Sequence, residues 1–284
     1  MTQQSVLFDA PGPRTVVRHR LYTVLALAVV AALLAVVAYR FYQRDQFAGE
    51  KWEVFVTPDY VRFIIVDGLW ETLKMAAASI VGAVVLGLVL GIGKLSDHAL
   101  LRVPCWAVVE FFRAVPVVML MLFFLTIYGI TNGQFGSFMC VVWALTLYNG
   151  AVLAEVFRAG ILAVPHGQSE AAYAVGMRKS QVVWIVLLPQ AVKIMIPAII
   201  SQMVVTLKDT SLGYVIAAPG LTAVARPIYQ EFHNHVPTFI VIALIYILIN
   251  LLLTLLATWI QRRFVGERKQ LEVSAVGTAD QTTV

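Results

Sequence analysis

Four consecutive polar residues at the end of a long apolar stretch are the first candidates for ligand chemistry in this sequence. They are Lys208, Asp209, Thr210 and Ser211. A helix that breaks near membrane depth exposes backbone groups and helix termini, which can bind a zwitterion. Lys208 and Thr210 could donate hydrogen bonds to a carboxylate, and Asp209 could accept them from an ammonium group. A polar loop where the helix leaves the membrane is an equally open interpretation.

Two pairs of opposite charge precede this segment. Glu155 and Arg158 are three residues apart, so they share one face of a helix. The spacing favours an ion pair that fixes the helix. A gate or a substrate contact stays open as an alternative, because ionisable groups at membrane depth are costly and often functional. Glu110 and Arg113 repeat the spacing, and we expect Arg113 and Pro116 at the start of a span.

Asn149 lies nearer the middle of its apolar stretch than these charges do. Polar side chains at such depth more often bridge helices than bind cargo, and both roles are kept here. The predicted substrate path therefore combines one amide with six ionisable or hydroxyl residues: Asn149, Glu155, Arg158, Lys208, Asp209, Thr210 and Ser211.

No pattern in the chain predicts a catalytic site. The run GLVLGIGKL (87–95) looks like a phosphate loop, but Leu95 stands where that motif needs serine or threonine. His233 and His235 have the spacing of metal ligands without a third ligand nearby, so no metal site is predicted. The two cysteines, Cys105 and Cys140, predict no disulfide framework. We expect no cofactor on this chain, and any ATP hydrolysis would belong to another polypeptide.

The composition predicts an all-α integral membrane protein. The chain is 60% hydrophobic and 13% charged, with a mean hydropathy of +0.82. Its apolar stretches have the roughly 20-residue length of spanning helices, whereas barrel strands would have about 10 alternating residues. We expect about six spans and an interfacial helix over residues 97–112. The predicted spans are 21–42, 69–94, 113–131, 136–158, 190–208 and 237–260.

The distribution of basic residues predicts that both termini are cytoplasmic. Twelve cations flank the spans on that side, namely Arg14, Arg18, Arg20, Lys94, Arg102, Arg158, Arg178, Lys179, Arg262, Arg263, Arg268 and Lys269. Five lie on the opposite side, namely Arg40, Arg44, Lys51, Arg62 and Arg226. The net charge of +5 is explained by this bias, and it does not indicate nucleic-acid binding.

The spans divide the chain into predicted regions. The first span is too long for a signal peptide and is interpreted as a retained extra helix. The last residues are polar, lack aromatic side chains and are expected to be disordered. The regions are a cytoplasmic tail (1–20), the extra transmembrane helix (21–42), an extracytoplasmic linker (43–68), a transmembrane core (69–262) and a cytoplasmic tail (263–284).

Glycines punctuate the second span in a pattern typical of close helix packing. Gly87 and Gly91 form a G-x-x-x-G pair, with Gly82 and Gly93 nearby. Small residues at this spacing let two helices approach closely, so we expect a helix contact rather than a substrate path.

A loop over residues 165–189 separates two spans although it carries charges. Its sequence from 169 is SEAAYAVGMRKSQVVWIVLLP, which predicts helix, turn, helix. Ser169 is expected to cap the first helix, with Glu170 in its first turn, and Gly176 to end it in a left-handed turn. Ser180 is expected to cap a second helix before Pro189 opens the next span. The small-faced first helix is shaped to dock into a groove of another protein.

The loop resembles the EAA loop of ABC-importer permeases, which is EAA, three residues, G, nine residues, I-x-L-P. Val186 in place of isoleucine is the one departure. The resemblance implies a coupling helix that inserts into a partner ATPase. The residues that match are Glu170, Ala171, Ala172, Gly176, Leu188 and Pro189.

The resemblance covers roughly residues 65–262 and points to the polar amino-acid subgroup of these permeases. Matching segments are 68–76, 110–124, 148–172 and 207–222, with departures at Ala114, Val115 and Ala159. The extra first helix and the sequence EFFRAVP (110–116) most resemble the corresponding features of actinobacterial glutamate-uptake permeases.

The resemblance implies the membrane subunit of an ATP-driven importer in a bacterial cell membrane, carrying a polar amino acid such as glutamate. It implies a five-helix type I importer core plus the extra helix. The implied partners are an ATPase dimer that uses ATP and Mg²⁺, a second permease subunit, identical or related, and an extracytoplasmic binding protein. Two rivals remain: an ion-gradient-driven secondary transporter using Glu71 and Glu155 as a carboxylate relay, and a scaffold that moves nothing.

Overall fold

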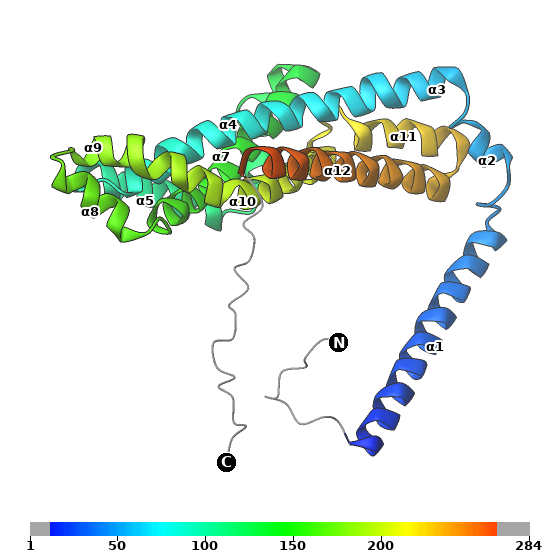
Figure 1. The fold of residues 1–284 in the computed structure, drawn as a ribbon. Helices are drawn as coiled ribbons and strands as arrows, with labels where there is room; N and C mark the ends of the chain where they lie inside the picture. The colour runs from blue at the N-terminus through cyan, green and yellow to red at the C-terminus, as the bar shows by residue number, and fades with distance from the viewer. Residues whose placement is uncertain (1–11, 266–284) are drawn as a thin grey trace, which may run out of the picture. The chain divides into compact units, whose positions relative to one another are not determined.

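The computed structural model describes residues 12–265, and these are helical without any strand (Figure 1). The chain divides into two compact units. The first takes residues up to Val61 and Pro227–Val241, and the second takes Arg62–Arg226 and the chain from Ile242. Five helices are long and apolar enough to cross a membrane, and a bent helix pair brings the possible total to six. The predicted all-α membrane class is confirmed.

The first unit begins with the long helix α1 (Pro13–Gln43). This helix is apolar, and no residue of its most hydrophobic stretch is buried. It starts before residue 21, so residues from Pro13 in the predicted tail are helical. The short α2 (Glu50–Glu53) follows. The amide of Asn234 donates to the carbonyl of Lys51 at 3.0 Å, which ties α2 to the turn between α11 (Leu221–Phe232) and α12 (His235–Val265).

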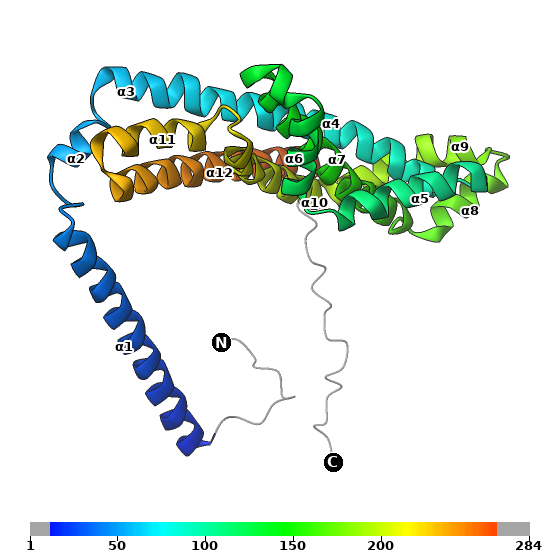
Figure 2. The ribbon, with the colours of Figure 1, turned by 180° about the vertical axis from the view of Figure 1, so that it is seen from behind.

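In the second unit, α4 (Glu71–Lys94) packs along α7 (Gly133–Leu162), as both ribbon views show (Figures 1 and 2). A Cβ atom at Gly87 would lie 2.9 Å from the carbonyl oxygen of Gly150, and one at Gly91 would lie 2.7 Å from that of Ala154. The predicted glycine contact between helices is therefore confirmed. The helix also begins earlier than residue 69, because α3 (Pro58–Phe63) and the π-helical segment η1 (Ile64–Trp70) lead into α4 without a break.

The next apolar element is a bent pair of helices, which is long enough to cross a membrane only if the two helices are taken together. The predicted separate helix at 97–112 is α5 (Ala99–Ala114), and α6 (Val117–Ile127) leaves it at 100°. The predicted span start at Arg113 was wrong, since Arg113 lies in the last turn of α5. Val115 is extended (φ −79°, ψ 127°) because the residue before a proline avoids helical geometry, and Pro116 then caps α6.

The remaining elements form one long helical run after a short helix. They are α8 (His166–Ala174), α9 (Lys179–Gln181), the π segment η3 (Val182–Leu187), α10 (Leu188–Asp209) and the 3-10 segment η4 (Thr210–Ile216). The predicted break at Lys208 was wrong, because α10 tightens into η4 and the run ends at Ala217, which has a left-handed φ of 52°. Of the predicted C-terminal tail (263–284), residues 263–265 are the end of α12, and residues from 266 lie outside the described residues.

The core of the second unit joins four of these elements. Side chains of α4, α6, α7 and η4 are buried together, including Met75, Met121, Val141, Leu145 and Ile216. Because lipid is as apolar as these side chains, close packing rather than water exclusion holds such an interior together. Two polar regions lie at opposite ends of α10, one at the loop formed by α8 and α9 and one at η4.

Candidate functional site

The EAA loop, residues 165–189, begins with α8. Pro165 is the N-cap residue and α8 starts at His166, so Ser169 lies inside the helix. The hydroxyl of Ser169 donates to the carbonyl of His166 at 2.7 Å. The predicted Ser169 cap was therefore wrong, and Glu170 lies in the second turn rather than the first. The physical reason is Pro165, whose extended ψ of 132° starts the helix earlier.

Gly176 ends α8 as the sequence predicts. Its φ is +80°, a left-handed value that favours glycine. The amide of Met177 donates to the carbonyl of Ala172 at 3.2 Å, and that of Gly176 donates to Tyr173 at 2.9 Å. These two bonds are those of a Schellman motif, which reverses the chain with its carbonyls satisfied.

The second arm of the loop runs directly into the membrane helix. Arg178 is the N-cap residue, and its amide donates to the side-chain oxygen of Gln181 at 2.9 Å, so the predicted Ser180 cap was wrong. The helix does not stop before Pro189. Pro189 has no amide hydrogen to give the preceding turn, and the widened π segment η3 precedes it. α9, η3 and α10 therefore form one continuous helical run.

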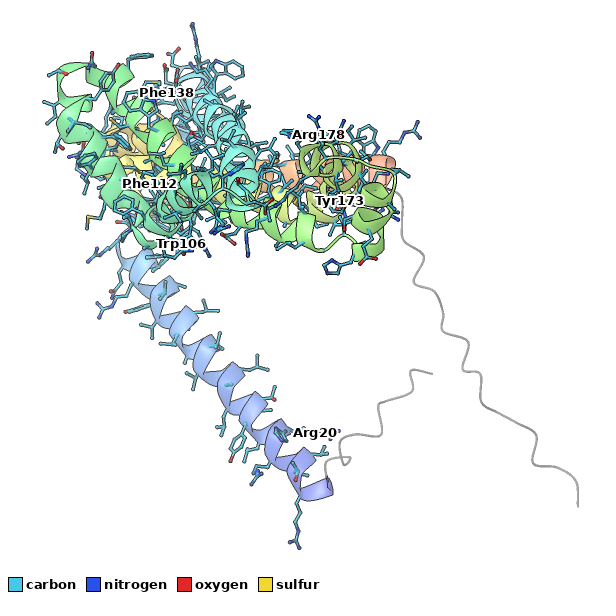
Figure 3. The ribbon with its side chains drawn as sticks, turned by 90° about the vertical axis from the view of Figure 1, so that its left-hand side faces the viewer. Arg20, Trp106, Phe112, Phe138, Tyr173 and Arg178 are labelled. Atoms are coloured by element: carbon cyan, nitrogen blue, oxygen red, sulfur yellow. The ribbon has the colours of Figure 1, made fainter. Side chains whose placement is uncertain are left out.

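The exposed face of α8 does not consist of alanines alone. Glu170 and Ala171 are exposed, while Ala172 is buried because α8 packs against η3. Tyr173 and Val175 expose 48% and 77% of their surface. Figure 3 shows Tyr173 and Arg178 on the two arms of the loop. Of the other matching residues, Leu188 is half-buried and Pro189 is exposed.

A charged cluster lies where α4, α5 and α7 meet. It consists of Lys94, Glu110, Arg113, Glu155 and Arg158. The Lys94 side chain is 6% exposed and its ammonium pairs with Glu155 and, at 3.3 Å, with Glu110. The predicted pairs are confirmed, with Arg113 3.6 Å from Glu110 and Arg158 3.6 Å from Glu155. Sequence reasoning missed Lys94, which joins the two pairs.

Four members of the charged cluster line a cavity of about 330 Å³, namely Lys94, Glu110, Glu155 and Arg158. Arg102 and Trp106 of α5 complete the wall, and the guanidinium of Arg102 donates to the backbone carbonyls of Ser96 and Asp97. Lys94 is enclosed by both glutamates, so its charge is compensated inside the protein.

One ion pair connects the EAA loop to this region. The Lys179 ammonium of α9 pairs with the Asp97 carboxylate in the short turn between α4 and α5. Hydrogen bonding from Lys179 lowers the pKa of Asp97 below its ordinary value, since it stabilises the charged carboxylate. In Figures 1 and 2, α5, α8 and α9 lie at the same end of the second unit.

The predicted substrate residues at the other end of α10 are largely unpaired. Lys208 is exposed and Asp209 is half-buried, and within the described part of the chain neither has an ion-pair partner. Thr210 is buried and its hydroxyl donates to the carbonyl of Leu207 at 2.7 Å. The carbonyl of Ser211 accepts from the Thr222 hydroxyl at 3.4 Å.

Asn149 is fully buried and connects two helices. Its side-chain oxygen accepts a hydrogen bond from Gln202 of α10 at 2.5 Å, and its amide donates to the carbonyl of Leu145. This is the helix-bridging geometry that the sequence favours at such depth. The structure therefore does not bring together all seven predicted substrate residues. Asn149 lies in the packed middle, Glu155 and Arg158 at the charged cluster, and Lys208 to Ser211 near η4.

Sequence reasoning missed two residues, Lys94 and Gln202, and only Lys94 carried a signal in the sequence. The predicted topology places Lys94, Glu110 and Glu155 at one membrane level, and opposite charges at one level are candidates for pairing. Gln202 had no such signal, because only the packing of α7 against α10 reveals its partner. Across residues 12–265, no three histidine, cysteine or acidic side chains gather as metal ligands, and both thiols are free.

Comparison with known proteins assigns this arrangement to a family. Residues 79–266 match the family described as binding-protein-dependent transport system inner membrane component. The chain belongs to that family. Its several apolar helices and this match make it a multi-pass membrane protein.

Curated relatives of this family member are amino-acid permeases. It is 42% identical to the glutamate transport system permease protein GluD of Corynebacterium glutamicum, over 81% of this chain and 85% of the relative. It is 31% identical to the glutamate/aspartate import permease protein GltK of Escherichia coli O6:H1, over 70% and 92%. The histidine/lysine/arginine/ornithine permease HisM of Salmonella typhimurium is also 31% identical, over 76% and 94%.

Solved structures agree with the fold. The chain is similar to an amino acid ABC transporter crystallised with histidines, at a TM-score of 0.64 and 31% identity, covering 72% of this chain and 95% of that one. Similarity to the MetNI methionine ABC transporter, at a TM-score of 0.64 and 22% identity over 73% and 99%, supports the fold alone. A secondary transporter is not supported, and its two candidate relay carboxylates, Glu71 and Glu155, both pair with lysines.

Proposed function

We propose that this family member is the permease subunit of an ATP-driven ABC importer of glutamate in a bacterial cell membrane. The observation that carries the proposal is the identity with GluD, which extends over 81% of this chain. The exposed EAA loop with its Gly176 turn supports the same conclusion, because it has the residues and the shape of a docking helix. Both termini would be cytoplasmic, on the side of this loop.

The proposed partners follow from that role. A binding protein outside the cell would deliver the amino acid, and a second permease subunit would complete the path. An ATPase dimer would bind ATP and Mg²⁺ and receive the face of α8 that carries Glu170 and Ala171. The exposed Tyr173 and Val175 give that face apolar area to bury in a protein groove.

Lys208 and Asp209 are the residues we propose for the substrate path. Their charges are unpaired in the described part of the chain, and they suit the carboxylates and the ammonium group of glutamate.

The experiment is reconstitution of the chain with its ATPase, second permease and binding protein in vesicles. We expect glutamate to stimulate ATP hydrolysis and to accumulate inside, with little effect of lysine or histidine. Stimulation by another amino acid would overturn glutamate as the substrate, while the assignment as an ATP-driven importer would stand. Transport by the chain alone, abolished by an ionophore, would overturn the assignment as an ATP-driven importer.

The EAA loop is tested in the same vesicles. Glu170→Lys and Gly176→Pro should abolish uptake while the protein stays in the membrane. Glu53→Lys, the same charge reversal at an exposed position of α2, is the matched control and should transport normally. Retained ATP-driven uptake in both loop variants would contradict the coupling role.

A further inference from the structure

The EAA loop is held to the membrane helices by more than its chain connections. Along the chain, α8 follows α7, and α9 leads through η3 into α10. Neither connection reaches α4 or α5. The ion pair between Lys179 and Asp97 does, since Asp97 lies in the four-residue turn between these helices. Among residues 12–265, no other ion pair connects the loop to a different element.

The turn that carries Asp97 is itself anchored. It begins directly after Lys94, whose buried ammonium pairs with Glu155 of α7 and Glu110 of α5. The guanidinium of Arg102, in the first turn of α5, donates to the carbonyls of Ser96 and Asp97 at 3.3 and 3.4 Å. The turn that carries Asp97 is therefore fixed to α4, α5 and α7.

These contacts close a ring. The chain runs from Glu155 in α7 through α8 to Lys179, the ion pair crosses to Asp97, and Lys94 returns to Glu155. A closed ring of contacts resists independent movement of its members better than an open chain does.

We infer that Asp97 and Lys179, anchored by Lys94, form a second mechanical link that transmits movement of the EAA loop to α5 and through the 100° bend to α6. This inference rests on the proposed coupling role of the loop. Asp97 and Lys179 are positioning residues, since neither is placed in the substrate path.

The exposure of the pair makes its role separable from stability. The Asp97 and Lys179 side chains are 75% and 44% exposed, and exposed ion pairs contribute little to folding. Loss of the pair should therefore uncouple transport from ATP hydrolysis without unfolding the permease.

The test is a charge-swap series in the complete reconstituted importer, with glutamate imported per ATP hydrolysed as the readout. Lys179→Glu should lower this ratio about fivefold or more, the range of typical coupling between sites, while the ATPase remains bound. Adding Asp97→Lys should restore the ratio to within about twofold. Arg178→Glu, the same charge reversal at the exposed neighbouring position, is the matched control. Adding Asp97→Lys to this control should not raise the ratio of glutamate imported per ATP hydrolysed.

Three results decide the matter. A wild-type ratio in Lys179→Glu, or no rescue by Asp97→Lys, overturns the link. If Glu170→Lys abolishes uptake while Lys179→Glu leaves it unchanged, the link fails and the coupling role stands. If neither change affects uptake, the proposed function of the loop fails as well.

A cross-link provides a second measurement that does not depend on charge. Asp97→Cys with Lys179→Cys, after replacement of Cys105 and Cys140 by alanine, should keep coupled uptake when the two thiols are joined by a short reducible bis-thiol cross-linker, because the two positions move together. Uptake that stops on cross-linking and returns on reduction would show that they separate during transport, which overturns the link.

Discussion

Within residues 12–265, charged side chains are paired near one end of α10 and unpaired at the other. At the end next to the EAA loop, Lys94 is compensated by two glutamates and Lys179 by Asp97. At the other end, Lys208 and Asp209 have no ion-pair partner in the part of the chain that is described. The sequence made Glu155 and Arg158 at the first end and Lys208 and Asp209 at the second candidate contacts for substrate, although it favoured an ion pair for Glu155 and Arg158.

We propose that this difference in charge pairing separates residues that transmit movement from residues that bind substrate. Paired charges hold helices in fixed relative positions and have little capacity left for a ligand. Unpaired charges at the edge of a membrane helix are unfavourable unless a ligand or water compensates them, so they are the better substrate candidates. We therefore propose Glu155 and Arg158 for transmission, and Lys208 and Asp209 for binding.

Lys94→Met should have the largest effect, because it removes the buried cation that pairs with both Glu110 and Glu155. We expect a loss of about 2 kcal/mol, below the roughly 3–5 kcal/mol of fully buried pairs since both glutamates are partly exposed. Thermal unfolding in detergent checks it, with Lys208→Met as the control that should unfold like the wild type. Equal destabilisation by both variants would show that charge pairing does not distinguish the two ends of α10.

Asp209→Asn should impair transport without impairing the fold. A charge-assisted hydrogen bond to substrate is worth about 1.5–3 kcal/mol, so the KM for uptake should rise at least about tenfold. Thermal stability should stay the same or increase, since a half-buried and unpaired carboxylate is removed. Normal uptake kinetics would exclude Asp209 from the substrate path.

Gly176→Ala sharpens the picture of the loop end. The position has room for a methyl group, since no atom lies within 4 Å, but its φ of +80° opposes an L-residue by about 1 kcal/mol. We expect faster amide exchange at the end of α8 and reduced coupling. Gly167→Ala, inside α8 with equal space and no positive φ, is the control and should protect the helix. Identical exchange in the two variants would show that the turn does not hold the loop.

The pH dependence of the Asp97 contact should be the smallest effect. The pKa of Asp97 is lowered in the folded state, so its contribution is present above the unfolded pKa and is lost only as pH falls through the lower, folded value. Between pH 8 and 5, the coupling difference between wild type and Asp97→Asn should therefore be constant. A difference that disappears within this range would place a different titrating group at the contact.

Much of the architecture could be predicted because bilayer thickness imposes long apolar helices. The helix-ending turn at Gly176, the glycine contact of α4 with α7 and both i,i+3 ion pairs follow from local rules. The starts of α8 and α9 do not follow from these local rules, because Pro165 and Arg178 are the N-cap residues in place of Ser169 and Ser180. Lys208 to Ser211 continue the helix as a 3-10 segment, since polarity alone does not break helical hydrogen bonding.

The sequence by itself determined the membrane class, the EAA loop and the family resemblance, because apolar length and motif spacing are properties of one chain. Only the tertiary structure decided which charges are paired. Lys94 meets residues 16 and 61 positions away, and Lys179 meets one 82 positions away. Such partners depend on how α4, α5 and α7 pack together, and no local spacing rule contains that information.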